Sequence, residues 1–238
     1  MISRRLFLAL TGGTLAAPSA SWAADSDEED QVPALLDHLI LGCKDLDRGI
    51  DLVEENTGVR PAIGGVHPGR GTRNALLSLG ERRYLEIIAP DPAQQKIVHF
   101  PQIREMREPR LIGWAVHPKD IVAIAKQLGE NKIAFQGPDD GSRKRPDGGV
   151  LTWKTVNLAD DRQGLLPFFI EWSADSVHPS KDAAARCRLE YFEILSVDPD
   201  ELTLTFKRIG LDLPVQRSDK ARLRALIGGP KGDLGLTT

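Results

Sequence analysis

The chain has 238 residues, a formal net charge of −3 at pH 7 and only two cysteines. A balance this close to neutral, with one short basic run at residues 142–145, argues against a nucleic-acid-binding protein. Two cysteines are too few for a disulfide scaffold, and whether Cys43 pairs with Cys187 stays open. After the leader described next, no apolar run is long enough to span a membrane, so we expect a soluble protein once the leader is removed.

Residues 1–23 have the composition of an export leader. The motif SRRLFLA resembles the twin-arginine signal, a short apolar run follows it, and a small-x-small cleavage site ends at Ala23. We therefore expect a periplasmic or secreted protein exported by the twin-arginine route, with an ordinary secretory signal as the alternative. Residues 24–34 are acidic at their start and poor in apolar side chains, which predicts a solvated linker.

The next segment predicts elements in the order β-α-β-β-β. Residues 35–43 are an apolar run of strand length. Asp45 is placed to cap a helix whose apolar residues share one face and which ends at Gly58. Three strand-like runs follow at residues 61–66, 74–79 and 84–88.

The same order begins again with a strand at residues 111–118. Asp120, 75 residues after Asp45, is the second predicted helix cap. Residues 137–149 are rich in Gly, Pro, Asp and Arg and predict a long solvated loop, although it could instead cover a cleft. Two more strands are predicted at residues 151–158 and 166–173.

A third, partial copy begins at Arg188. It has a strand at residues 189–196, a helix starting at Asp198-Pro199, and a late strand at residues 222–229. A repeat fixes the architecture, so we predict an α+β fold in which paired βαβββ modules form a curved, cleft-enclosing sheet. The alternative is a coincidental α+β pattern. Residues 35–180 would hold the two modules, and residues 181–238 a C-terminal extension packed on the same fold.

Two carboxylates interrupt apolar strands. Glu86 lies in RYLEIIAP and Glu171 in LLPFFIEWS. Burying an unpaired carboxylate costs several kcal/mol, so such a group is normally paired, protonated or bound to a metal. A strand-end salt bridge, for example between Glu86 and Arg83, is the simpler explanation for either residue.

Several stretches of the chain resemble the glyoxalase-like domain proteins of the vicinal oxygen chelate superfamily, over about residues 35–180. They are LDHLILGCKDLDRG, HPGRGTRNALLSLGERRYLEIIAPDP, GSRKRPDGGVLTW and GLLPFFIEWS. The resemblance implies metal ligands on the first and last strand of each module. At these positions the chain has His38, Glu86 and Glu171, with Gly113 at the fourth, which offers no ligand. One His and two Glu suit a divalent ion such as Fe, Mn, Ni or Zn.

The resemblance therefore implies a metal-dependent lyase or isomerase, or with iron a dioxygenase, acting on a small oxygenated molecule. Glu171 could also serve as the catalytic base. His67, Arg70 and Asn74 lie in a glycine-containing loop and are candidates for substrate binding, with a simple turn as the alternative. Trp172 is expected to face away from the site, because side chains alternate along a strand and Glu171 is placed inward.

The second hypothesis is a metal-free protein that binds or sequesters a small molecule. Gly113 favours it, whereas two uncompensated glutamates in apolar strands disfavour it. An interaction module is a third possibility with no feature in its favour. A homodimer is possible, although two modules in one chain could suffice.

Overall fold

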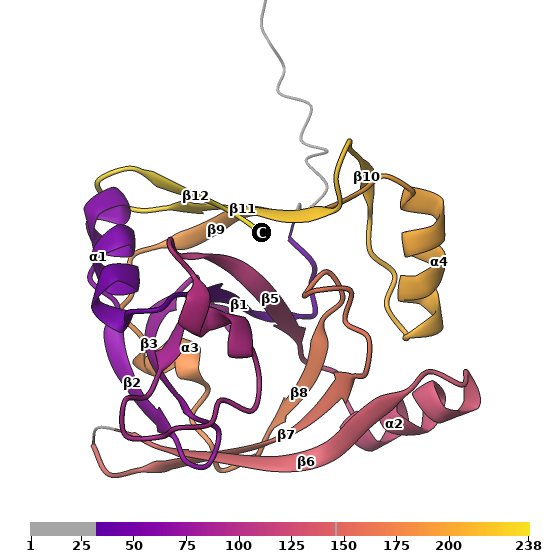
Figure 1. Cartoon of the computed structure of the whole chain (residues 1–238), viewed down its shortest axis with the longest axis horizontal. Coiled ribbons are helices and arrows are strands. Elements are labelled where there is room, and N and C mark those ends of the chain that lie inside the picture. Colours follow the sequence, from indigo (N-terminus) through magenta and orange to yellow (C-terminus); the bar gives the residue numbers. More distant parts are fainter. Residues whose placement is uncertain (1–31, 146) are drawn as a thin grey trace, which may run out of the picture.

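The computed structural model describes residues 32–145 and 147–238 (Figure 1). The export leader and most of the acidic linker predicted above lie outside the described residues. The two βαβββ modules are both present, and the predicted fold class is confirmed.

The first module follows the predicted order. Asp45 accepts a hydrogen bond from the N–H of Asp47 and caps the first helix. Gly58, with a left-handed φ of 75°, ends that helix, a conformation that glycine adopts without strain. The elements are β1 (Leu36–Gly42), α1 (Leu46–Thr57), β2 (Ala62–His67), β3 (Thr72–Ser78) and β4 (Tyr84–Pro90).

The second module repeats this order after a short 3₁₀ helix at Pro101–Glu105. Asp120 caps its helix by accepting from the N–H groups of Val122 and Ala123. The elements are β5 (Arg110–Val116), α2 (Ile121–Glu130), β6 (Phe135–Lys144), β7 (Val150–Leu158) and β8 (Phe168–Trp172).

Strand β6 corrects one expectation, because it occupies much of the predicted loop at residues 137–149. Its residues are mostly polar and exposed, so no apolar alternation marks it in the sequence. The strand is held by its antiparallel ladder with β7, and it is an edge strand, where charged side chains are common.

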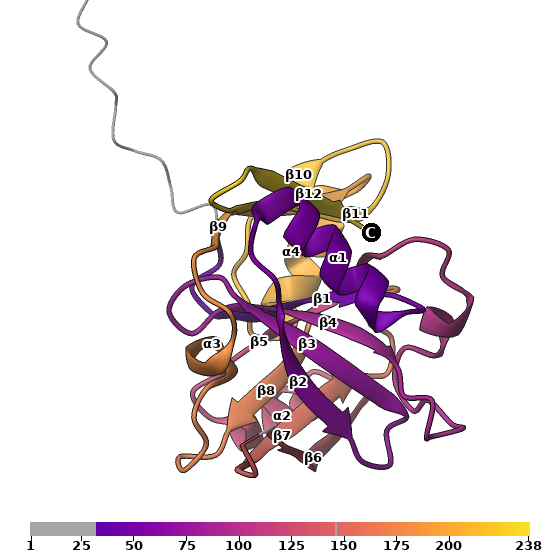
Figure 2. The same ribbon diagram turned by 90° about the vertical axis from the view of Figure 1, so that its left-hand side faces the viewer.

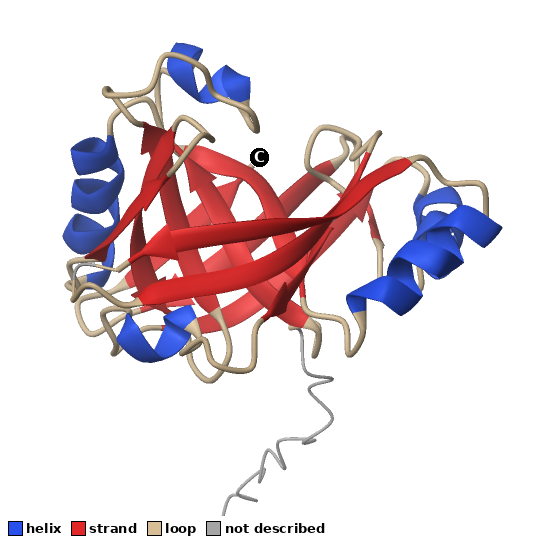
Figure 3. Ribbon diagram, turned by 90° about the horizontal axis from the view of Figure 1, so that it is seen from below, coloured by secondary structure: helices blue, strands red, loops and turns tan. Residues whose placement is uncertain are grey.

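The two modules share one eight-stranded sheet, in the order β2-β3-β4-β1-β5-β8-β7-β6. The antiparallel pair β1–β5 joins them at the centre. The sheet curls so strongly that its edge strands meet, since Arg143 of β6 donates a hydrogen bond to the carbonyl of Gly64 in β2. Figure 3 shows the strands wrapping around the interior.

The C-terminal part forms a second sheet, in the order β10-β9-β11-β12. Figures 1 and 2 show it lying across one end of the first sheet, beside α1. Trp114 of β5 packs against Phe192 and Phe206, with ring centroids 5.0 and 6.2 Å apart, so both sheets share one core. The elements are α3 (Pro179–Asp182), β9 (Arg188–Ser196), α4 (Pro199–Arg208), β10 (Gln216–Arg217), β11 (Arg222–Gly228) and β12 (Asp233–Thr237).

Two further expectations can be compared with the structure. Cys43 and Cys187 are both buried, free thiols. Among the described residues, no helix has the length and apolar character needed to cross a membrane.

Candidate functional site

The concave side of the curled sheet encloses a pocket of about 90 Å³. This is well below the roughly 300–1,000 Å³ of sites that take drug-sized ligands, so the pocket suits a small molecule. Both modules line it. The polar and charged lining residues are His38, His67, Arg70, Thr72, Asn74, Tyr84, Glu86, His99, Arg143, Thr155 and Asn157, and the apolar wall includes Phe168, Ile170 and the indoles of Trp153 and Trp172.

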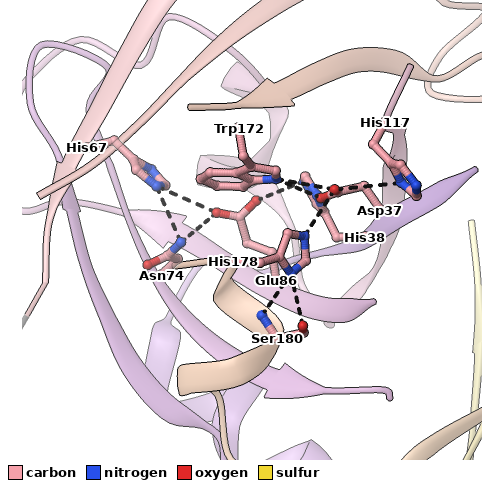
Figure 4. A network of polar contacts seen from close by, with 9 residues as sticks. All are labelled: Asp37, His38, His67, Asn74, Glu86, His117, Trp172, His178 and Ser180. Carbon is pink, nitrogen blue, oxygen red and sulfur yellow. Dashed lines mark hydrogen bonds and ion pairs between the residues drawn. The ribbon is translucent and has the colours of Figure 1, made fainter. Parts of the chain in front are cut away.

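Glu86 lies at the centre of the polar side of the pocket and is only 8% exposed. Its Oε1 accepts a hydrogen bond of 2.6 Å from Nδ2 of Asn74. His38 and His67 flank the carboxylate, each with its Nε2 at 3.6 Å from a carboxylate oxygen (Figure 4). The buried charge is therefore stabilised by the hydrogen bond from Asn74, and among the described residues Glu86 forms no salt bridge with Arg83.

His67 is held in its neutral form by burial. Desolvation lowers its pKa to about 4, and the nearby Glu86 carboxylate only partly opposes this. Its Nδ1 lies 2.8 Å from the hydroxyl of Thr72, and its Nε2 lies 3.3 Å from Nδ2 of Asn74. Because the Asn74 amide donates there, Nε2 of His67 is the ring's acceptor and Nδ1 carries its proton.

His38 is held in place by the carboxylate of Asp37, which was not among the predicted site residues. Its Nδ1 lies 2.7 Å from Oδ1 of Asp37, and its ring stacks on Tyr84 with centroids 4.5 Å apart. A carboxylate can only accept, so Nδ1 of His38 carries the proton and Nε2 faces Glu86.

A β-bulge explains how two consecutive residues make this contact. Leu36 pairs with Val116 and His38 with Ala115, so Asp37 is an extra residue in β1. A bulge of this kind re-aims a side chain that regular alternation would send to the other face.

Asp37 is fully buried and lies at the centre of a set of donors that we call the Asp37 cluster: Asp37, His38, His117, Trp172 and His178. It accepts from Nε1 of Trp172 at 3.2 Å and from Nε2 of His178 at 3.1 Å, and Nδ1 of His117 lies 3.9 Å away (Figure 4). Burial alone would raise the pKa of Asp37, but the hydrogen bonds from His178 and His38 outweigh it and hold the pKa well below its usual range.

Glu171 does not lie in the pocket. Its Oε2 accepts a hydrogen bond of 2.8 Å from the N–H of Ile121, at the first turn of α2. A carboxylate at a helix N-terminus satisfies an unpaired donor and complements the helix dipole. Trp172 lines the pocket instead. The prediction that Glu171 points into the site and Trp172 away from it was therefore wrong.

The strand register shows which residues of the second module match the first. In the first module His38 pairs with Tyr84, and Glu86 is two residues farther along β4. In the second module Ala115 pairs with Phe168, and Ile170 is two residues farther along β8. The second module therefore presents Ala115 and Ile170, instead of the expected Gly113 and Glu171, where the first presents His38 and Glu86.

This arrangement does not match the three-ligand metal set predicted from the sequence. Glu171 lies outside the pocket that His38 and Glu86 line, so the three predicted ligands do not converge on one point. Within residues 32–145 and 147–238, no three or more His, Cys, Asp or Glu side chains are placed to hold a metal ion.

The structure thus brings together five of the six predicted site residues, namely His38, His67, Arg70, Asn74 and Glu86. Their roles stay predictions. Arg143, expected in a solvated loop, is buried in β6 and lines the pocket. The Asp-His pair in the apolar run LLDHLILGC was a local sign of the Asp37 cluster, but the bulge that unites the pair leaves no sequence pattern of its own.

Comparison with known proteins agrees with this fold. The glyoxalase-like domain family matches residues 36–210. The chain belongs to this family, which is part of the vicinal oxygen chelate superfamily. The matched range continues past residue 180 through α4. No curated protein matches the sequence significantly.

Solved structures align with this chain at low sequence identity, and the first of them shares its fold. A hypothetical protein from Staphylococcus aureus is 19% identical, with a TM-score of 0.60 over 85% of this chain and 84% of that chain. A Streptomyces coelicolor methylmalonyl-CoA epimerase variant in complex with 2-nitronate-propionyl-CoA is 18% identical, with a TM-score of 0.45 over 60% of this chain and 96% of that chain. The methylmalonyl-CoA epimerase from Mycobacterium tuberculosis is 17% identical, with a TM-score of 0.42 over 60% of this chain and 89% of that chain.

Proposed function

We propose that the protein is an enzyme that moves a proton on a small oxygenated molecule, as an isomerase or lyase does, with Glu86 as the base. The observation that carries the proposal is the buried Glu86 carboxylate, held by Asn74 at 2.6 Å and flanked by two imidazoles on the wall of the pocket. A positioned carboxylate in a site of low polarity is a competent general base.

The neighbours of Glu86 give each step a place for the proton. The amide of Asn74 holds one carboxylate oxygen, Oε1, while Oε2 faces His38. Because Asp37 holds the Nδ1 proton of His38, the lone pair on Nε2 can accept a proton that Glu86 has taken from the substrate. His67, neutral at pH 7, lies on the opposite side of Glu86.

A metal-dependent version, including a dioxygenase, remains a prediction from the family resemblance. Glu171 lies outside the pocket, and the matching positions of the second module, Ala115 and Ile170, carry no donor. The described residues therefore do not fit the predicted metal, and no step of the proposed reaction depends on one.

Proton transfer can be tested without knowing the natural substrate. The protein is incubated in D₂O with a panel of small 2-oxo and 2-hydroxy acids and aldehydes, and loss of C–H signal is followed by proton NMR. Wild type should accelerate exchange on at least one compound, and Glu86→Gln should lose at least about a hundredfold in rate.

Glu171→Gln is the matched control, since it removes an equal charge from the other face of the sheet and should leave exchange unchanged. Equal exchange in wild type and Glu86→Gln on every compound would contradict the proposal.

The second candidate is a binding or sequestration protein of the same fold. Uncompensated carboxylates were the argument against it, but the amide of Asn74 hydrogen-bonds Glu86 and the N–H of Ile121 hydrogen-bonds Glu171. Binding of a panel compound without any exchange would favour this candidate.

Export and assembly complete the proposal. Export by the twin-arginine route is supported by residues 1–23, which lie outside the described residues. Mass spectrometry of the periplasmic fraction should find a mature chain starting at residue 24. The double substitution Arg4→Lys and Arg5→Lys should abolish the appearance of this mature chain. A homodimer is a possible assembly, and light scattering after gel filtration would measure it.

A further inference from the structure

We infer that the pocket takes a small monoanionic carboxylate and that Arg143 binds its negative charge. The inference names the substrate class for the proposed function and rests on the same pocket. Arg143 is assigned no role by the family resemblance, and its sequence context predicted a solvated loop.

Arg143 is a buried cation that forms no direct ion pair with a described carboxylate. Its side chain lines the pocket and the residue is only 4% exposed. Its one side-chain hydrogen bond among the described residues goes from Nη1 to the backbone carbonyl of Gly64. No described carboxylate lies within 4 Å of it, whereas Arg145, two residues along, pairs with Asp147 and Asp182. The charge of Glu86 acts on Arg143 only from beyond this distance. A buried charge is normally paired in direct contact, so a direct partner is missing here.

The meeting of the two sheet edges fixes the direction of the guanidinium. Gly65 has a φ of +138°, and a Cβ at this position would lie 2.6 Å from the carbonyl oxygen of Lys144. Only glycine lets the edges approach this closely. With Nη1 bound to Gly64, the rest of the planar fork stays available to a ligand in the pocket, and such a fork suits a carboxylate.

The charges that line the pocket set the charge of the ligand. Arg70 and Arg143 are positive, Glu86 is negative, and burial keeps His67 neutral. The lining therefore has one positive charge in excess, which a monoanion neutralises. A dianion such as a phosphate would bring a second negative charge next to Glu86.

A hydroxyl on the same wall also lacks a partner. Thr155 is 3% exposed, and within the described part of the chain its Oγ1 makes no hydrogen bond. Buried hydroxyls are normally bonded, so this group is a second sign that a polar ligand completes the pocket.

Paired probes test the charge directly in the full-length chain. Acetate is compared with acetamide, and lactate with lactamide, by titration calorimetry. The two members of each pair have nearly the same shape, and only the carboxylate is charged. We expect the carboxylate of at least one pair to bind at least about tenfold more tightly than its amide, since charge-assisted bonds are about twice as strong as neutral ones.

Arg143→Gln should reduce carboxylate binding to the level of the amide, and Arg145→Gln should leave the preference unchanged. Arg143→Lys keeps the charge but loses the fork, so the preference should fall severalfold without vanishing. A thermal melt shows whether Arg143→Gln folds without the contact with Gly64. If it does not fold, Arg143→Lys still tests the inference.

Several outcomes would overturn the inference. They are equal binding of acid and amide, no binding of either carboxylate, an unchanged preference in both Arg143 variants, or tighter binding of inorganic phosphate than of the carboxylates. The assay requires no turnover. A failure of proton exchange would therefore leave this inference standing, and a failure here would leave the exchange result standing.

Discussion

Replacing Asp37 by Asn tests the Asp37 cluster. The carboxylate has no solvent exposure and accepts hydrogen bonds of 2.7, 3.1 and 3.2 Å from His38, His178 and Trp172. An asparagine of the same shape keeps one acceptor oxygen but presents an NH₂ group where the second oxygen was. One of three donors would then face another donor.

The expected loss follows from these contacts. A hydrogen bond to a charged group contributes roughly 1.5–3 kcal/mol, and removing one partner of a buried charged set costs about 3–5 kcal/mol. The three hydrogen bonds share one acceptor and the site can relax, so their contributions do not simply add. We therefore expect Asp37→Asn to lower the free energy of unfolding by about 3–5 kcal/mol. Native domains have free energies of unfolding of about 5–15 kcal/mol, so Asp37→Asn should be severely destabilised.

Urea unfolding at pH 7 measures this loss. The midpoint should fall while the slope stays close to that of wild type. Asp47→Asn, an exposed change in the first turn of α1, is the control and should lose less than about 0.5 kcal/mol. A loss below about 1 kcal/mol for Asp37→Asn would refute the reasoning that the cluster stabilises the fold.

The same variant has a pH signature. The folded pKa of Asp37 is lowered from its ordinary value of 3.8, so the unfolded chain takes up this proton first as the solution is acidified. The stability that Asp37 contributes is therefore complete above about pH 4 and is lost as the pH falls below that value. Stability curves of wild type and Asp37→Asn should converge at low pH.

Three further predictions concern other parts of the molecule. The pKa of His67 falls from 6.5 to about 4 on folding, so acidification over that range should cost wild type roughly 3 kcal/mol, and His67→Gln should lack this part of the slope. Parallel pH curves would contradict it. Glu171→Gln should lower the free energy of unfolding by about 0.5–1 kcal/mol, through the first turn of α2, without changing ligand binding. A loss of binding would instead place Glu171 in the site. Gly71→Ala should cost at least about 2 kcal/mol, because its Cβ would lie 1.9 Å from a backbone carbonyl, whereas Gly69→Ala, with a similar φ and open space, should cost about 1 kcal/mol. Equal losses would contradict it.

The parts of the fold that the sequence predicted depend on local chemistry. Asp45, Asp120 and Asp198 each place a carboxylate before an apolar helical face, and all three cap the helices that follow. Strand β6 was missed because its partner β7, not its own composition, keeps it extended. A polar edge strand and a polar loop have the same sequence pattern.

The candidate site was predicted less completely, because the register of a strand decides which of its side chains point into the pocket. A shift of one residue in a strand reverses which side chains point inward, and both Glu171 and Trp172 show this. The bulge at Asp37 has the same effect within β1, since it brings Asp37 and His38 together. Such irregularities arise from pairing with β5, which the sequence of β1 alone does not contain.

Glu86 shows how far a buried charge can be interpreted from sequence. Its position in an apolar strand predicted a compensating group but not which kind, because a cation, a basic side chain or a set of polar neighbours all reduce the cost of burial. In the structure the first module supplies the hydrogen bond from Asn74, with His38 and His67 on either side of Glu86, while the second supplies aromatic walls and Arg143. A site divided in this way has Glu86 and the two imidazoles on one side and the buried guanidinium of Arg143 on the other. A small carboxylate held by Arg143 would therefore present its neighbouring carbon to Glu86, and this links the ligand inferred here to the proton transfer proposed above.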